Sequence, residues 1–224
     1  TETLWQQFTG RAIVGDLVGE WLAPLPTQMM GMGQFAAEYP GGAVLSRETG
    51  VNRSYGETPY PGYDRPLQPR SPLGPMGDRR LFPMERVLGF TVLEMDGEQV
   101  REVPAAIPLK DLAGSGALNF TVAEQDLVAF HAPGASSALD EKNIAEGRDV
   151  GTTGLFSSHV ADRKLTFNPD GSFFVDEETG SVWTITGLAV DGCLAGERLE
   201  PVVHYDTFWF VWVAFKPGSV LWGR

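Results

Sequence analysis

Residues 10–24 read GRAIVGDLVGEWLAP, and residues 187–201 read GLAVDGCLAGERLEP. At this constant offset the two stretches share three glycines, a Gly-Glu pair and the closing proline, and the match continues as far as Pro40 and Pro217. Glycines at fixed spacing mark turns, and self-similarity along a chain indicates repeated structural units. The sequence therefore predicts two related tandem units.

The two copies differ in what precedes them. A long stretch rich in strand-forming residues, 87–177, leads into the second copy, whereas only residues 1–4 lead into the first. We therefore expect the first unit to be incomplete at its N-terminus, so that an upstream segment or a second chain would complete it. The predicted organisation is the C-terminal part of the first unit (1–50), an ordered Tyr/Pro-rich connector (51–86) and a complete second unit (87–224).

Alternating apolar residues and turn residues predict antiparallel strands through the second unit. We expect a hairpin over 87–103 that turns at Asp96-Gly97, a buried strand at 127–130, and a meander over 164–204 with turns at 168–171 and 176–180.

Two helices are expected at equivalent places, over 29–39 and 206–216. Asp206 or Thr207 would cap the second helix, and Pro217 would end it. A strand over 208–215 stays open as an alternative, because short apolar runs are ambiguous. The predicted class is β-rich α+β, with two related tandem units of antiparallel strands that each carry a short apolar helix.

Charge and composition exclude several classes of partner. The chain of 224 residues has 17 Lys and Arg against 29 Asp and Glu, a formal net charge of −12. This balance argues against a nucleic-acid or anionic membrane partner, because both rely on clustered basic residues. Its apolar runs are too short for a transmembrane segment. The single cysteine, Cys193, excludes a disulfide within the chain and a metal cage made of thiolates alone.

Several strings resemble the family known as domain of unknown function 3179. They occur in order at 44–50 (VLSRETG), 55–60 (YGETPY), 137–140 (SALD), 147–151 (GRDVG), 176–183 (DEETGSVW) and 208–217 (FWFVWVAFKP). The resemblance covers nearly the whole chain and implies two tandem units and an extracytoplasmic location, whether periplasmic, secreted or surface-anchored. It implies no activity. Family members typically carry a Cys-x-x-Cys motif, whose nearest counterpart here begins at His131.

Histidine and cysteine side chains give a first hypothesis, a zinc or copper site at the junction of the units. The candidate ligands are His131, His159, His204 and Cys193, because imidazole and thiolate suit these metals. These residues are not at a typical ligand spacing. The alternative is that each histidine is a polar side chain at a strand end or in a loop.

The loop that follows the buried strand gives a second hypothesis, hydrolase-like or metal-dependent catalysis by residues 131–151. Its candidates are His131, Ser137, Asp140, Arg148 and Asp149. The Gly-x-Ser-x-Gly motif of many hydrolases is missing. Arg148 and Asp149 would alternatively fix the loop as structural residues.

A third hypothesis is a non-catalytic, exported module that binds a small ligand, a metal or a protein partner in a pocket between the units. Candidate ligand-binding residues are Arg53, Tyr55, Tyr60, Tyr63 and His204. Tyrosine offers a large contact area with a polar tip, and arginine pairs with anions. The alternative is that these rings hold the connector in place.

Overall fold

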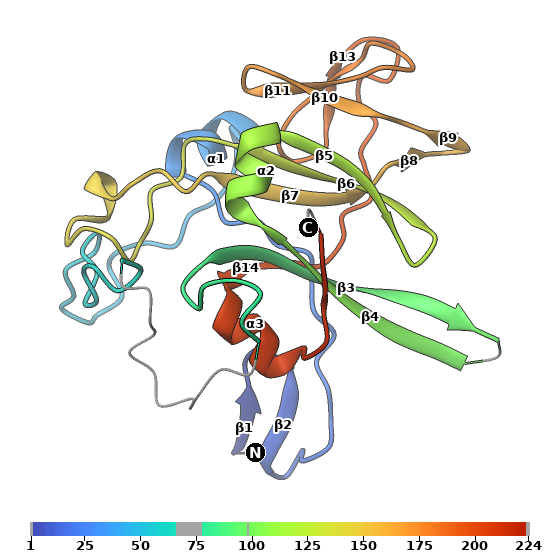
Figure 1. The fold of residues 1–224 in the computed structure, drawn as a ribbon. Helices are drawn as coiled ribbons and strands as arrows, with labels where there is room; N and C mark the ends of the chain where they lie inside the picture. Colours follow the sequence, from blue (N-terminus) through green and yellow to red (C-terminus); the bar gives the residue numbers. More distant parts are fainter. Residues whose placement is uncertain (1, 66–77, 98, 223–224) are drawn as a thin grey trace.

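The computed structural model describes residues 2–65, 78–97 and 99–222 (Figure 1). Within these ranges the chain is mainly antiparallel β-sheet, with three short α-helices and one 3-10 turn. The β-rich α+β class is therefore confirmed. The predicted connector is described only in part, because residues 66–77 lie outside these ranges.

One sheet is built around a long hairpin, as the alternation over 87–103 predicts. Its order is β14-β3-β4-β15, antiparallel except for the parallel pair of β15 and β4. The hairpin brings Asp96 opposite Gln99, which agrees with the predicted turn. The strands are β3 (Arg86–Asp96), β4 (Gln99–Pro108), β14 (His204–Phe208) and β15 (Val220–Leu221).

A second, three-stranded sheet packs on the first. Its order is β5-β6-β7, and the predicted buried strand 127–130 lies in β6. These elements are α2 (Leu109–Ser115), β5 (Ala117–Val122), β6 (Gln125–Ala132) and β7 (Thr152–Ser157). Residues of both sheets and of α2 share one core, which includes Leu88, Phe90, Ile107, Leu112, Phe120, Leu127, Ala129 and Leu155.

A third sheet, β10-β11-β12-β13, covers the other side of β6 and closes a second core. There Phe130 stacks on Phe174 with ring centroids 3.9 Å apart, and Trp183 is fully buried. The strands are β10 (Phe167–Asp170), β11 (Phe173–Asp176), β12 (Val182–Trp183) and β13 (Ala189–Asp191), next to the small hairpin β8 (His159–Val160) and β9 (Arg163–Lys164). The predicted turn 168–171 is wrong in its first residues, because 168–170 pair with β11.

The apolar helix near the C-terminus is α3 (Trp209–Phe215), so the strand alternative is wrong there. The predicted caps are also wrong. Asp206 and Thr207 belong to β14, where they pair with Leu88 and Val87, and the residue before the helix is Phe208. Trp212 packs over Gly89 of β3, where an added Cβ would overlap its ring.

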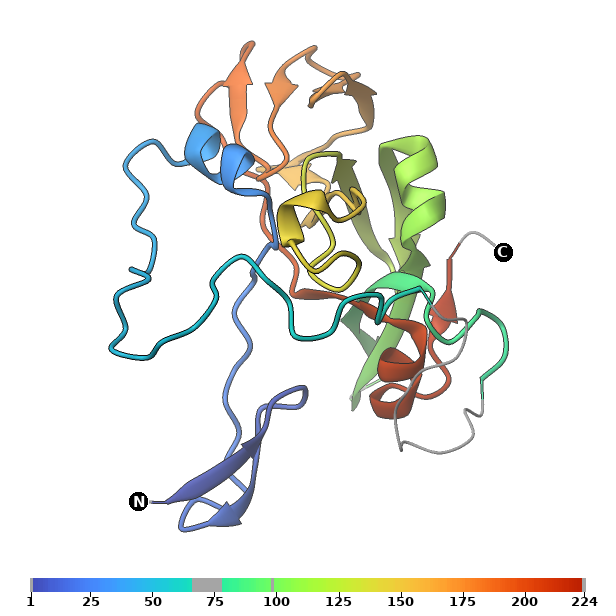
Figure 2. The same ribbon diagram turned by 90° about the vertical axis from the view of Figure 1, so that its left-hand side faces the viewer.

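The first copy of the repeated stretch forms a separate hairpin, β1 (Thr3–Gln6) and β2 (Arg11–Gly15), which projects away from the three sheets (Figure 2). Phe8, in its turn, stacks on Tyr205 at 4.9 Å and on Phe215 at 4.5 Å between ring centroids. These aromatic contacts dock the hairpin against β14 and α3.

An extended segment leads from the hairpin to α1 (Met32–Glu38), which is shorter than the predicted helix 29–39 and has no buried residue. Polar side chains attach this segment to the sheets. The Gln28 amide donates to the carbonyl oxygens of Thr153 and Ile185, both at 2.9 Å. The other attachments join Gln34 to Thr152 and Pro133, and Glu38 to Thr186.

Candidate functional site

Strand β14 presents two titratable side chains to one face of its sheet. His204 and Asp206 are two residues apart, and side chains at that spacing lie on the same side of a strand. The Thr153 hydroxyl lies 2.8 Å from both oxygens of the Asp206 carboxylate. Thr153 belongs to β7, so this contact joins two sheets.

Burial decides the protonation of Asp206. Loss of water around the carboxyl group raises its pKa above the ordinary aspartate value. The charges of His204 and Arg86 and the hydrogen bond from Thr153 act in the opposite direction and do not cancel this effect. Asp206 can therefore hold a proton at a pH where a surface aspartate is ionised.

His204 has one ring nitrogen bonded and one free. Its Nδ1 lies 2.9 Å from the carbonyl oxygen of Val202, and since a carbonyl only accepts, Nδ1 carries a proton. Its Nε2 is buried and has no hydrogen-bond partner among the residues that the structure describes. Most buried polar atoms are paired, so this nitrogen needs an explanation.

A pocket of about 490 Å³ opens beside these two residues. It lies between the turn of the N-terminal hairpin and the corner of β14 and α3. Polar and apolar residues both line it: Gln6, Gln7, Phe8, Thr27, Met29, His204, Tyr205, Asp206, Thr207, Val211 and Phe215. Pockets of this size, with a few polar groups among apolar ones, are typical of small-molecule sites.

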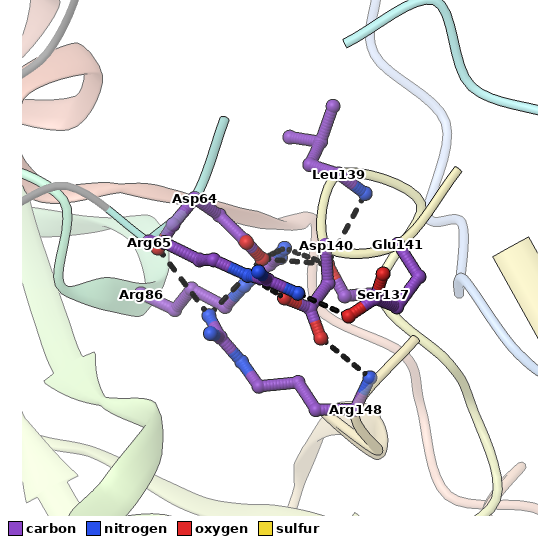
Figure 3. Close-up of polar contacts among 8 residues, drawn as sticks. All are labelled: Asp64, Arg65, Arg86, Ser137, Leu139, Asp140, Glu141 and Arg148. Carbon is purple, nitrogen blue, oxygen red and sulfur yellow. Dashed lines mark hydrogen bonds and ion pairs between the residues drawn. The ribbon is translucent and has the colours of Figure 1, made fainter. Parts of the chain in front are cut away.

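A network of charged side chains around the buried Asp64 lies near the start of β3 (Figure 3). The Asp64 side chain is fully buried, and its Oδ2 accepts from Arg86 and Arg148, both at 3.0 Å. Ser137 donates its hydroxyl to the same oxygen at 2.6 Å. Arg86 also reaches Ser137 Oγ at 2.9 Å, and its charge acts on Asp206. The network and the pocket are thus electrostatically connected.

Asp140 forms the outer part of this network. Its carboxylate accepts from Arg65 Nε at 2.7 Å and from the backbone N–H of Arg148 at 2.9 Å. Arg65 and then the Arg148 amide hold the pKa of Asp140 below its ordinary value. Arg65 also pairs with Glu141. These contacts attach the connector to the loop after β6.

The structure brings together only some of the catalytic candidates. Ser137, Asp140 and Arg148 share the network around Asp64, whereas His131 and Asp149 lie outside it. His131 Nε2 is 3.1 Å from the carbonyl oxygen of Val150. Asp149 accepts from the backbone N–H groups of Gly134, Ala135 and Gly151, an arrangement that fixes the loop.

The ligand-binding candidates of the connector do not line the pocket. Tyr63 packs partly buried against Phe208, Met84 and Phe210. Tyr60 is exposed and lies edge-on to Tyr63, and the Tyr55 hydroxyl bonds Thr49 Oγ1 at 2.9 Å. Arg53 is exposed. Of this set only His204 lines the pocket.

The metal candidates are scattered. In the part of the chain that the structure describes, no group of three or more His, Cys, Asp or Glu side chains could hold a metal ion. Cys193 is exposed, with its Sγ 4.0 Å from Ser181 Oγ. His159 lies 3.2 Å from Asp126. His131 and His204 are both close enough to Asp206 to act on its charge.

Three residues of the pocket and of the charge network around Asp64 are not among the candidates that the sequence offers. The sequence predicts Asp206 as a helix cap, whereas the structure places it in β14; its neighbours Tyr205, Thr207 and Phe208 are residue types that favour strands. Asp64 and Arg86 gave no signal, because their pairing depends on where the connector crosses the start of β3.

The helices of the described chain are seven residues long or shorter, and none could span a membrane. Fold and pocket together define a β-rich α+β protein with a pocket between an N-terminal hairpin and a helix-capped sheet. The family model described as protein of unknown function (DUF3179) matches residues 1–219, so the chain belongs to this family. No curated protein and no solved structure matches the chain.

Proposed function

We propose that the chain binds a small neutral molecule in the pocket between the turn at 6–8 and the corner of β14 and α3. His204 and Asp206 are its hydrogen-bonding residues. The observation that carries this proposal is His204 Nε2, a buried nitrogen without a partner in the described chain, on a residue that lines the pocket. An unpaired buried polar atom costs free energy, and a ligand group bonded to it would remove that cost.

The lining indicates the chemistry of the ligand. Among the described residues around the pocket there is no Lys or Arg, so the site lacks the groups that bind anions. Its only acidic group is Asp206, whose raised pKa favours the neutral acid. Thr27, Thr207 and Gln6, whose side chains end in hydroxyl or amide groups, also line the cavity. A neutral molecule with hydroxyl or amide groups and one apolar face suits this set.

The loop 131–151 suits a structural role better than catalysis or metal binding. The Ser137 hydroxyl donates to Asp64 and accepts from Arg86, so it has no histidine base in its contacts. Asp149 is occupied by three backbone amides. Hydrolase-like or metal-dependent activity at this loop is therefore the second proposal, behind ligand binding.

The test uses two exposed methionines that are three residues apart. Met29 is 58 % exposed and lines the pocket, whereas Met32 is 60 % exposed and does not. Ligand-observed NMR with monosaccharides, polyols and small amides as probes should detect binding to the wild type. Met29→Trp should reduce binding about tenfold by filling the pocket, and Met32→Trp should leave it unchanged.

Equal binding to both variants would place the ligand elsewhere, and no binding of any probe to the wild type would contradict the proposal. Circular dichroism of both variants provides the control for folding, since each substitution is made at a surface position.

Three wider proposals accompany this one. The division into 1–50, 51–86 and 87–224 as first unit, connector and second unit is supported by the repeated stretch. The extracytoplasmic location rests on the family resemblance alone. The acidic net charge of −12 supports a function without nucleic acid.

A further inference from the structure

The two copies of the repeated stretch fold into the same local hairpin geometry. In the first copy Ala12 N–H donates to Glu20 O at 3.0 Å and Leu22 N–H to Gly10 O at 2.9 Å. In the second copy the equivalent bonds run from Ala189 to Glu197 at 3.0 Å and from Leu199 to Gly187 at 2.9 Å. Three glycine pairs, Gly10 and Gly187, Gly15 and Gly192, and Gly19 and Gly196, all have positive φ.

Strand pairing in the two copies is also equivalent. Trp5 of β1 lies opposite Ala12 of β2, and Trp183 of β12 lies opposite Ala189 of β13. In both pairs the register shifts just before the tryptophan.

The surroundings of the two hairpins differ on one side. Strand β12 has a second neighbour, β11, which places Phe174 opposite Trp183 and Val175 opposite Val182. Within the described chain, β1 pairs with β2 alone. Its outer edge therefore offers unpaired backbone groups, which is the usual site at which a further strand adds to a sheet.

Equivalent apolar side chains are buried in one copy and uncovered in the other. Trp183 has no exposed surface, whereas Trp5 is only half-buried. Leu199 is 2 % exposed, whereas its equivalent Leu22 is 55 % exposed. Leu4, beside Trp5 on the free edge, is 63 % exposed. The first copy thus has the apolar surface of a hairpin that packs against further chain.

The second copy also shows which polar group a neighbouring strand supplies. The indole Nε1 of Trp183 donates to Asp176 Oδ2 at 2.9 Å, and Asp176 ends the neighbouring strand β11. In the described part of the chain no side chain accepts from Trp5 Nε1. A carboxylate at the equivalent place in a partner strand would provide this acceptor.

We propose that the free edge of β1 is a docking site for a polypeptide β-hairpin from outside residues 1–224, of the kind that β10 and β11 form. The inner strand of this hairpin runs antiparallel to β1. This strand places an aromatic residue opposite Trp5 and a β-branched residue opposite Leu4. An acidic side chain at the end of the strand, equivalent to Asp176, accepts a hydrogen bond from Trp5 Nε1.

The experiment uses the full chain and a cyclised synthetic peptide with the sequence of residues 165–180 as the probe. Cyclisation preorganises the hairpin and lowers the entropy cost of binding. Amide hydrogen exchange, followed by mass spectrometry, should show slower exchange in residues 3–6 when the peptide is added. Exchange in β12 should not change, because that strand already has its neighbour.

Two substitutions test the proposed contact. Trp5→Phe keeps an aromatic ring and removes the N–H donor, and Asp176→Leu in the peptide removes the acceptor. Each should weaken binding about threefold to tenfold. The two substitutions together should weaken binding by less than the product of their separate effects, because both remove the same hydrogen bond. The matched control is Ile13→Asp, which should leave binding unchanged, because Ile13 and its equivalent Val190 are both exposed, at 55 % and 47 %.

Three results would overturn the proposal. One is unchanged exchange in residues 3–6 up to the solubility limit of the peptide. Another is binding that Trp5→Phe does not weaken. The third is protection of residues 3–6 that grows with protein concentration in the absence of peptide, which would show that a second copy of the chain occupies the edge.

Discussion

At Asp64 a single carboxylate joins three parts of the chain that are distant in the sequence. Arg86 begins β3, Arg148 and Ser137 belong to the loop after β6, and Asp64 itself lies in the connector. A buried charge is tolerated only where partners surround it. Asp64 therefore fixes the path of the connector over the sheets.

The Asp64→Asn substitution should destabilise the fold strongly. It leaves Arg86, whose side chain is 15 % exposed, without its anion, and loss of one partner from a buried pair costs about 3–5 kcal/mol. Urea unfolding measures the change. Arg65→Met is the control in the same network, and it should have a much smaller effect, because the Arg65 side chain is 53 % exposed. Equal losses for both variants would contradict this interpretation of Asp64.

At single residues the local sequence predicts candidates and not their contacts. His204 is a ligand-binding candidate of the sequence and lines the pocket, and its binding role stays a prediction. Asp206 was assigned to a helix cap, because an aspartate before an apolar run is typical of one. Its place in β14 depends on pairing with Leu88, 118 positions earlier, and the residues next to Asp206 do not determine a contact at that separation.

Among the elements, the N-terminal hairpin is docked on β14 and α3 by the aromatic ring of Phe8. Phe8 stacks on Tyr205 and Phe215 and meets the edge of Trp212 at 6.0 Å. Because the same turn forms one wall of the pocket, the position of Phe8 also sets the shape of the site.

Phe8→Ala should release the hairpin without unfolding the sheets. Loss of two stacked ring pairs removes about 1–3 kcal/mol from docking. Amide exchange in residues 3–15 should become faster, while exchange in β6 should stay slow. Leu4→Ala, at an exposed position of the same hairpin, is the control and should leave exchange unchanged. An unchanged exchange rate in the Phe8 variant would show that other contacts dock the hairpin.

Element types were predicted better than element ends. The hairpin 87–103 and the apolar helix before Pro217 are present, because alternation and apolar runs report which side chains need burial. The observed ends differ from the predicted ones where pairing with a distant strand determines where an element stops. Residues 168–170 contain turn formers, yet they pair with β11 and place the turn at Gly171.

At the scale of the whole molecule, three sheets pack on one another through β6, which contributes to both main cores. The β-rich class followed from strand and turn patterns. The order of strands in each sheet could not be predicted from these patterns. Strand β14 pairs with β3, and β15 with β4, only after the chain has passed through the entire third sheet.

Stability should depend on pH through Asp206. The folded pKa is raised above 3.8, the ordinary aspartate value, so the folded state binds this proton more tightly than the unfolded chain. The stabilisation that comes from this proton is therefore complete below pH 3.8 and is lost as the pH rises through the pKa of the folded state. Asp206→Asn removes this dependence. Thermal unfolding from pH 3 upward, compared between wild type and variant, measures it (~1.4 kcal/mol per pH unit at most, for one proton).

The direction of the pKa shift distinguishes Asp206 from Asp78 and Asp140. Asp78 and Asp140 have lowered pKa values, caused first by Arg80 and Arg65, so their contributions are lost as pH falls. Both remain in the Asp206→Asn variant and cancel in the comparison. A difference between the two proteins that stays constant with pH would contradict the assignment.

The polar attachment of the segment around α1 has a consequence for how the chain tolerates substitution. Residues 16–50 contain no buried side chain, and Gln28, Gln34 and Glu38 connect this segment to the sheets by hydrogen bonds of fixed reach. Leu45, at 96 % exposure and outside the pocket lining, tolerates other side chains, whereas shortening the Gln28 or Gln34 side chain by one methylene breaks a connection. In most folds apolar positions tolerate substitution least. Along this segment the polar side chains that bond to the sheets tolerate it less than exposed apolar ones such as Leu45.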